Sequence, residues 1–117
     1  MAAKYAALFE IVSDYEGTTH FFFKGPTAKK IIQKFDAVQN IPCLIEQGRD
    51  AEDPQGQEVL DQLEAFYQKY LSGSVTFEDL QTFHVSLSIG SIRCACIAAG
   101  DEEIADLQRR YPKALRK

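Results

Sequence analysis

The clearest pattern of hydrophobic and polar positions in this chain lies toward its C-terminal end, in the segment HVSLSIGSIRCACIAA. Apolar and polar residues alternate on both sides of Gly90-Ser91, a two-residue turn signal. Alternation with a period of two is typical of β-strands that bury one face. The pattern therefore predicts a β-hairpin over residues 84–99 with its turn at Gly90-Ser91.

This predicted hairpin sorts its residues onto two faces. A turn at Gly90-Ser91 would set Leu87 opposite Cys94, and residues that lie opposite each other share a face. Val85, Cys94 and Cys96 are then expected to point into the core together. The opposite, polar face is expected to carry His84, Ser86, Ser88 and Arg93. Such a face is either the solvated side of a half-buried sheet, the commoner case, or a partner-binding surface with Arg93 as its anchor.

A second hairpin is predicted near the N-terminus, with strands over residues 5–13 and 18–24 and with Gly17 in the left-handed position of the turn. Alternation makes both of its faces apolar. One face carries Phe9, Ile11, Phe21 and Phe23, and the other carries Leu8, Val12, His20 and Phe22. Strands of this kind lie at the centre of a sheet that is covered on both sides, or covered on one side by a partner.

Helices are predicted where apolar residues recur at three- and four-residue spacing. The first begins at Gly25-Pro26-Thr27, and its apolar stripe includes Ile31 and Phe35. The most regular spans residues 54–71, where Asp53-Pro54 supplies an N-cap and a first helical residue.

Shorter segments complete the predicted order. Thr76 with Asp79 resembles a capping pair for a short helix, and Gly100-Asp101 starts the last helix. Residues 43–46 are predicted to be a short edge strand, and the polar stretch 48–56 is predicted to be a loop.

These elements predict the α+β class, with one domain over residues 1–117 and a short basic tail over 112–117. We expect an antiparallel sheet of four or five strands, built from the two hairpins and packed against three or four helices in the order ββα…αββα. A hairpin followed by glycine and a helix occurs at residues 5–36 and again at 83–111. We therefore expect the two hairpins side by side, with both terminal helices on one face.

Composition narrows the class of protein. A chain of 117 residues with 45% hydrophobic and 26% charged residues can bury its own core and is unlike a disordered chain. Its apolar runs are far shorter than the roughly 20 residues of a membrane span, and its first residues do not resemble a secretion signal. Three cysteines, two of them spaced Cys-Ala-Cys, favour reduced thiols. We expect a cytoplasmic protein with no membrane contact.

The net charge of −4 is concentrated in the middle of the chain. Nine acidic residues fall between residues 41 and 83, against only Arg49 and Lys69. This balance disfavours direct nucleic-acid binding, which needs clustered Lys and Arg. It is compatible with a basic protein partner and equally with a solvated helix face, which is the commoner case. The candidate partner-binding acids are Asp50, Glu52 and Asp53.

Metal binding and nucleophilic catalysis find little support. Zinc sites usually combine four ligands, often from C-x-x-C pairs, whereas the cysteines here are Cys43 and a C-x-C pair with His84 facing away. Core-facing thiols also lack the exposure and the neighbouring base that a nucleophile needs. The acidic stretch from Asp50 does not fit a calcium loop, because Gly56 comes one position late. We expect no metal, no cofactor and no catalytic constellation.

The start of the first helix is the best candidate anion site. Gly25, Thr27, Lys29 and Lys30 combine backbone N–H groups with two lysines at the positive end of a helix. A plain strand-to-helix turn explains the same residues more simply. The segment also lacks the lysine-ending glycine loop of nucleotide enzymes.

The sequence favours a small, cytosolic, non-catalytic binding or regulatory protein that acts through protein contacts. Inhibitors, antitoxins and immunity proteins work in this way, here with an acidic surface toward a basic or nucleic-acid-binding protein. An aromatic content of 11%, with three consecutive residues at Phe21–Phe23, further favours a homodimer. The alternative is a binding protein for an anionic metabolite, or a minor enzyme, with its site near residues 25–30.

Overall fold

The computed structural model describes residues 5–15, 17–51, 54–87 and 90–116. The strands are β1 (Tyr5–Ser13), β2 (Gly17–Gly25), β3 (His84–Leu87), β4 (Gly90–Ala99) and β5 (Leu115–Arg116). The helices are α1 (Ala28–Gln39), α2 (Ile41–Ala51), α3 (Pro54–Leu71), α4 (Phe77–Gln81) and α5 (Gly100–Arg110). The predicted α+β class is confirmed. None of the helices in these ranges is both long enough and apolar enough to pass through a bilayer.

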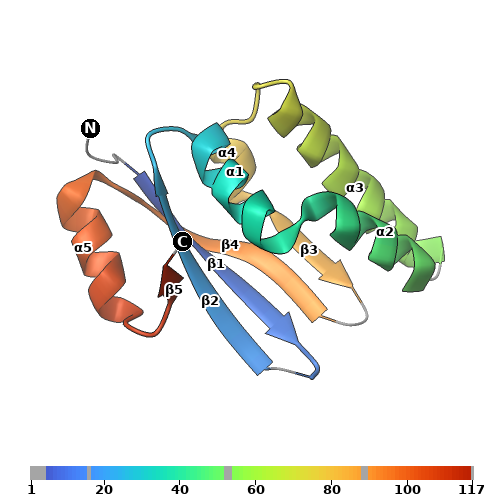
Figure 1. Ribbon diagram of the computed structural model, residues 1–117, viewed down its shortest axis with the longest axis horizontal. Coiled ribbons are helices and arrows are strands. Elements are labelled where there is room, and N and C mark those ends of the chain that lie inside the picture. The colour runs from blue at the N-terminus through green and yellow to red at the C-terminus, as the bar shows by residue number, and fades with distance from the viewer. Residues whose placement is uncertain (1–4, 16, 52–53, 88–89, 117) are drawn as a thin grey trace.

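The sheet has the strand order β3-β4-β1-β2-β5 (Figure 1). Its first four strands are antiparallel, and the two hairpins lie side by side through the pairing of β4 with β1, as predicted. The basic tail, to which the sequence analysis assigned no structure, contributes the two-residue strand β5. This strand runs parallel to β2, with Leu115 paired to Phe21.

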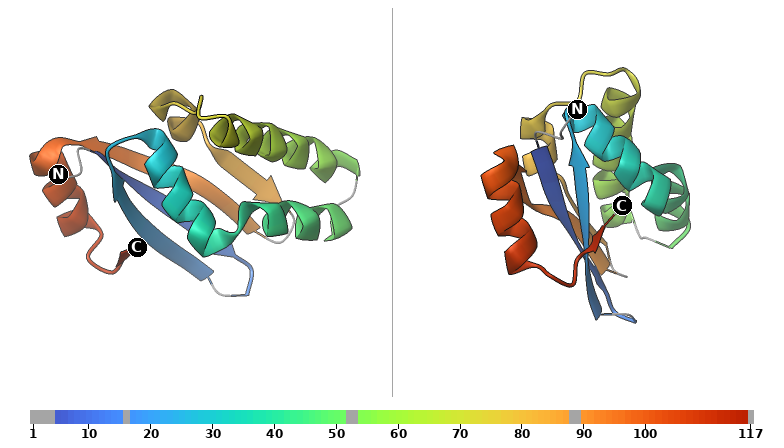
Figure 2. Two further views of the ribbon diagram at one scale, coloured as in Figure 1. Left: turned by 45° about the horizontal axis from the view of Figure 1, so that its top comes forward. Right: turned by 60° about the vertical axis from the view of Figure 1, so that its left-hand side comes forward.

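Helices cover both faces of the sheet (Figure 2). The main core lies under α1 to α4, where Ile31 and Phe35 of α1 pack on Phe9 and Phe23. A smaller core lies under α5, formed by Ala6, Leu8, Phe22, Ala98, Ile104 and Leu107. The prediction that both terminal helices share a face is therefore wrong. Because the first hairpin is apolar on both sides, each side needs its own cover.

The three consecutive phenylalanines are packed within one chain. Phe22 belongs to the smaller core, and Phe23 and the half-buried Phe21 pack in or against the main core. These aromatic side chains need no second copy of the protein to cover them. The homodimer stays a prediction that no longer draws support from them.

A helix, α2, occupies residues 43–46, for which an edge strand was predicted, and residues 48–51, for which a loop was predicted, so both predictions are wrong there. Residues 54–56 of the predicted loop belong to α3, and residues 52 and 53 lie outside the described part of the chain. Asn40 explains the difference. It adopts a left-handed conformation (φ 55°) that ends α1, and its side chain accepts the N–H of Cys43 at 3.3 Å in the first turn of α2. Pro42 therefore lies in a first helical turn, where its missing N–H costs nothing. The chain thus forms five helices in its described part rather than three or four.

The turn of the second hairpin lies two positions earlier than predicted. Leu87 pairs with Gly90 and Val85 with Ile92, so the predicted pairing of Leu87 with Cys94 is wrong. The connecting residues 88 and 89 lie outside the described part of the chain. A displacement by two positions leaves the alternation of faces unchanged. Val85 accordingly stays in the main core.

A β-bulge in β4 separates the two cysteines that were predicted to share a face. Phe9 of β1 pairs with Cys94, and Leu8 pairs with Cys96, so Ala95 is an extra residue on β4. Cys94 consequently packs in the main core, and Cys96 packs against the smaller core under α5. The predicted common orientation of these side chains is wrong.

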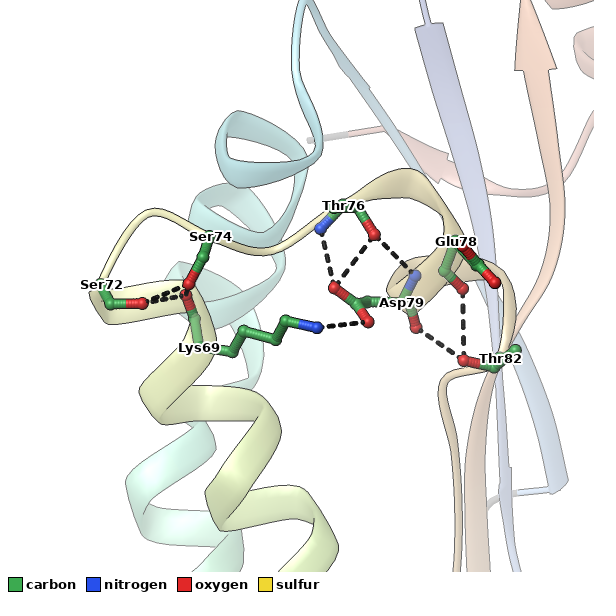
Figure 3. Close-up of polar contacts among 7 residues, drawn as sticks. All are labelled: Lys69, Ser72, Ser74, Thr76, Glu78, Asp79 and Thr82. Atoms are coloured by element: carbon green, nitrogen blue, oxygen red, sulfur yellow. Dashed lines mark hydrogen bonds and ion pairs between the residues drawn. The ribbon is translucent and has the colours of Figure 1, made fainter.

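The predicted capping pair at the start of α4 is confirmed (Figure 3). The N–H of Asp79 donates to Thr76 Oγ1 at 3.2 Å, and the N–H of Thr76 donates to Asp79 Oδ2 at 2.9 Å. Asp79 Oδ1 also accepts a hydrogen bond from Lys69 Nζ at 2.9 Å. Asp79 therefore links the end of α3 to the short helix that leads into β3.

We expect Asp79→Ala to lower the free energy of unfolding by about 1–2 kcal/mol near neutral pH, since it removes the Asp79 half of the capping box and the hydrogen bond from Lys69. The hydrogen bond from Lys69, followed by that from the Thr76 N–H, lowers the pKa of Asp79. A carboxyl group with a lowered pKa stabilises the fold above its unfolded pKa, and this contribution is lost as the pH falls through the folded pKa.

Urea denaturation near pH 7 and again near pH 3 checks this prediction. The difference between Asp79→Ala and the wild type is expected to shrink at the lower pH. Glu78→Ala is the matched control, because Glu78 is exposed and its side chain takes no part in the capping box. An equal loss in both variants would contradict the role assigned to Asp79.

Candidate functional site

Four polar side chains stand in line across the four antiparallel strands, on the face of the sheet that carries α5. His84 of β3 pairs with Arg93 of β4, Arg93 pairs with Glu10 of β1, and Glu10 pairs with His20 of β2. Alternation along each strand directs all four side chains away from the main core. We call His84, Arg93, Glu10 and His20 the cross-strand row.

Glu10 binds both of its neighbours in this row. Its Oε1 accepts a hydrogen bond from Arg93 Nε at 3.0 Å, and its Oε2 lies 3.3 Å from His20 Nε2. The side chains of Glu10 and His20 are 24% and 27% exposed. The ring of Tyr111, which follows α5, lies 5.1 Å from the His20 ring. The end of α5 therefore borders the cross-strand row.

Arg93 stabilises the negative charge of Glu10 in this row. The hydrogen bond from Arg93, assisted by that from His20, lowers the pKa of Glu10 although partial burial acts in the opposite direction. Glu10 is therefore an anion at neutral pH. Arg93 is 53% exposed, and within the described residues only its Nε has a partner. Its terminal nitrogens present a planar fork of the kind that binds carboxylates and phosphates.

A second row, rich in hydroxyl groups, lies beside the first toward the hairpin ends. Ser86 pairs with Ser91, Ser91 with Val12, and Val12 with Thr18. Val12 is one of the exposed large hydrophobic residues, at 36%. We call this row and the cross-strand row together the open sheet face. It is polar, lies on four paired strands, and is bordered at one end by α5.

Part of this surface was predicted from the sequence. His84, Ser86 and Arg93 lie on one exposed face as predicted, whereas Ser88 lies outside the described residues. Glu10 and His20 were missed as site residues. The sequence feature that could have revealed them is that each strand of this hairpin carries a polar residue on the same, largely apolar, face. Only the strand order shows that they stand next to Arg93.

The acidic residues form a separate surface on the other side of the sheet. Asp50 is exposed near the end of α2, and Glu52 and Asp53 lie outside the described residues. Nearby, Arg49 forms ion pairs with Asp61 at 2.9 Å and with Glu64 at 2.7 Å, which joins α2 to α3. Since α2 and α3 cover the face opposite α5, the structure does not bring Asp50 together with the open sheet face (Figure 1).

The candidate anion site forms a tight strand-to-helix turn. Thr27 Oγ1 accepts the N–H of Lys30 at 3.2 Å and so caps α1. Gly25 is buried, and a Cβ on it would lie 3.1 Å from Ile31 Cγ1. The side chains of Lys29 and Lys30 are exposed. Because the cap already uses one of the backbone donors, anion binding here stays a prediction without added support.

The three cysteines are in different environments. Cys94 is buried, and Cys43 on α2 and Cys96 are half-buried. Burial raises the pKa of Cys94 to about 12. In the described part of the chain, no group of three or more His, Cys, Asp or Glu side chains is arranged to hold a metal ion.

We expect Cys94 to react with iodoacetamide far more slowly than Cys43 at pH near 8, because only the thiolate is nucleophilic. Alkylation followed by peptide mass spectrometry measures the two rates in the same sample. In denaturant, the two rates are expected to become similar. Equal rates in the native protein would show that Cys94 is accessible and ionised more easily than its burial implies.

The open sheet face is therefore a polar surface on four paired strands, and it combines the ion-paired carboxylate of Glu10 with the outward-facing guanidinium of Arg93. No family model matches the chain, no curated protein matches it, and no solved structure matches it.

Proposed function

We propose that this protein is a non-catalytic binding protein that regulates a protein partner by contact through its open sheet face. The observation that supports this most strongly is the cross-strand row. Its ion pairs fix Glu10 and Arg93 on paired central strands. Charged groups that are already ordered before binding give specificity at a low entropic cost.

The same row argues for binding rather than for catalysis. The contact of His20 with Glu10 resembles the way in which a carboxylate orients a histidine base in hydrolases. A nucleophilic mechanism would also need a hydroxyl or a thiol within hydrogen-bond reach of the imidazole. Within the described residues, the structure gives the His20 side chain a hydrogen bond to Glu10 and a ring contact with Tyr111. Neither of these groups is an activated nucleophile.

The charges suggest what the partner is like. Arg93 would bind a carboxylate on the partner, and hydroxyl groups such as that of Ser86 would form adaptable hydrogen bonds around it. The net charge of −4 attracts a partner that is basic overall at long range, although the exposed acids of α2 and α3 lie on the opposite face of the sheet from the proposed contact. We therefore propose a basic protein that places one carboxylate at its contact surface.

Affinity capture from the source cells tests this proposal when it is run with matched variants. Ser86→Arg places a bulky charge on the open sheet face while keeping all four residues of the cross-strand row, and Arg93→Glu reverses the charge of the anchor. Arg109→Glu is the control, because Arg109 is an exposed arginine of α5 whose own ion pair is with Asp106.

A true partner is expected to bind the wild type and Arg109→Glu equally. Calorimetry with the purified partner is expected to show an affinity loss of about tenfold or more for both face variants, with a smaller affinity at higher salt. Circular dichroism establishes that the variants are folded. A partner that binds folded Ser86→Arg and Arg93→Glu as tightly as the wild type would overturn the proposal.

A further inference from the structure

An apolar cavity of about 180 Å³, open to solvent on one side, lies between the sheet and helices α1 to α3. It is formed between the strand ends and the junction of α1 with α2, and its walls include Ile11, Phe35, Ile41, Leu44, Leu87 and Ile92. Among the described residues of its lining, Gln39, Ser13 and Ser91 are polar and none is charged. None of the four residues of the cross-strand row lines this cavity, whereas Val12 and Ser91 of the second row border both sites.

The left-handed residue between α1 and α2 explains why space remains at this position. Asn40 ends α1, and the side chain of Asp36 accepts the N–H of Ile41 at 2.8 Å, so the start of α2 is held in a fixed direction. Buried Gly48 then brings α2 against α3, since a Cβ there would lie 2.7 Å from Leu60 Cδ2. Because these contacts hold α2 at its junction with α1 and against α3, α2 cannot move closer to the sheet.

The shape and lining of this cavity are those of a small-molecule site. Such sites are concave, are mostly apolar and carry a few polar groups that orient the ligand. Here apolar side chains such as Ile11, Phe35 and Ile92 form most of the described lining, with Gln39 among the polar residues. Water in this space would find few polar partners. An apolar ligand would therefore displace poorly bound water and cover apolar surface.

We propose that this cavity binds a small, neutral, apolar molecule. An engineered apolar cavity of about 150 Å³ in another protein takes up benzene, so the volume here suits a ligand of about six to ten non-hydrogen atoms. A charged ligand is disfavoured because the described lining residues offer no counter-charge. The amide of Gln39 can form one hydrogen bond with a polar substituent. This site goes beyond the proposed partner binding and does not depend on it.

Methyl NMR on the whole chain, with labelled isoleucines, tests the proposal with benzene, indole and benzoate as probes. The methyl groups of Ile11, Ile41 and Ile92 belong to the cavity walls, whereas Ile104 belongs to the core under α5. Benzene or indole is expected to shift the three wall signals in a saturable way and to leave Ile104 unchanged. Benzoate is expected to shift none of them. Absence of saturable shifts with both neutral probes would overturn the proposal.

A cavity-filling variant locates the site. Leu44 is a half-buried wall residue, and Leu44→Phe is expected to weaken probe binding about tenfold or more while the protein stays folded. Leu71→Phe is the matched control, because Leu71 is 54% exposed and lies outside the lining. It is expected to bind the probes like the wild type. Ile92→Phe replaces Leu44→Phe if the latter does not fold.

Probe binding that is unchanged in the filled variants, or equally weakened in Leu71→Phe, would also overturn the proposal. Arg93→Glu is expected to bind the neutral probes normally, since Arg93 points away from the cavity. A loss of partner binding in that variant with retained probe binding therefore separates the two proposals.

Discussion

Replacing Phe9 with alanine is expected to lower the free energy of unfolding by about 3–5 kcal/mol. Phe9 is fully buried in β1, and its ring stacks on Phe35 with a centroid distance of 4.4 Å. The rings of Phe23 and Phe83 meet it edge-on at 5.6 and 6.0 Å. Alanine would remove the ring that these three share. The total free energy of unfolding of a small domain is about 5–15 kcal/mol, so such a loss would leave the protein only marginally stable.

Urea unfolding followed by circular dichroism measures this loss. Tyr15→Ala is the control, because Tyr15 is 91% exposed and its replacement is expected to change stability by less than about 0.5 kcal/mol. A loss of under about 1 kcal/mol for Phe9→Ala would mean that the aromatic core repacks freely. The variant is also expected to weaken binding at the open sheet face, since Phe9 holds the strand that carries Glu10.

The second large effect is expected for Gly90→Ala, with a loss of at least about 3 kcal/mol. Gly90 begins β4 and pairs with both Leu87 and Ser13. Its φ of 155° is unusual for a residue with a side chain, and a Cβ there would lie only 2.2 Å from the carbonyl oxygen of Val12. That oxygen belongs to the backbone, so it cannot rotate away. Strands β1 and β4 would have to separate.

Gly17→Ala is the matched control for this clash. Gly17 also has a positive φ, of 77°, but a Cβ there would meet nothing within 4 Å. Alanine at this position is expected to cost only about 1–2 kcal/mol for the left-handed conformation. Thermal unfolding of the two variants separates backbone strain from the close approach of the strands. Equal losses would contradict the importance of the close approach at Gly90.

Gly90 also matters for the candidate site. The pairing of β4 with β1 sets Arg93 beside Glu10, three positions after Gly90. If alanine forces these strands apart, the hydrogen bond between Arg93 Nε and Glu10 Oε1 is expected to lengthen or break. Partner binding through the open sheet face should then fall together with stability, whereas Gly17→Ala should affect it less.

Local patterns predicted the elements whose signals are strong. Helix α3 occupies the predicted residues 54–71, and Thr76 with Asp79 forms the expected cap. The segment around Asn40 was misread because Asn-Ile-Pro resembles the end of a helix. It is indeed the end of one, but Asn40 also caps the next helix. When one residue both ends a helix and caps the next one, the local sequence pattern shows the end of the first helix but not the start of the second.

The alternation in β4 had a different weakness. Its second half consists of small side chains, with Ala95 between the two cysteines. Such residues fit either face of a sheet, so the sequence there does not specify a bulge. Pairing with the bulky Leu8 and Phe9 of β1 determines that β4 has a bulge at Ala95. The bulge directs Cys96 toward α5, which no pattern within the hairpin could show.

Outside the bulge in β4, the sequence by itself determined which strand side chains turn away from the main core, because alternation along a strand is a local property. It placed His84 with Arg93 and His20 with Phe22, each pair within its own hairpin. Only the tertiary structure decided that β1 lies between β4 and β2, and thus that Glu10 meets Arg93, 83 residues away. Strand order depends on how two-sided apolar strands are covered by helices from distant parts of the chain. The covering by α5 ends beside His20, and this leaves the open sheet face exposed.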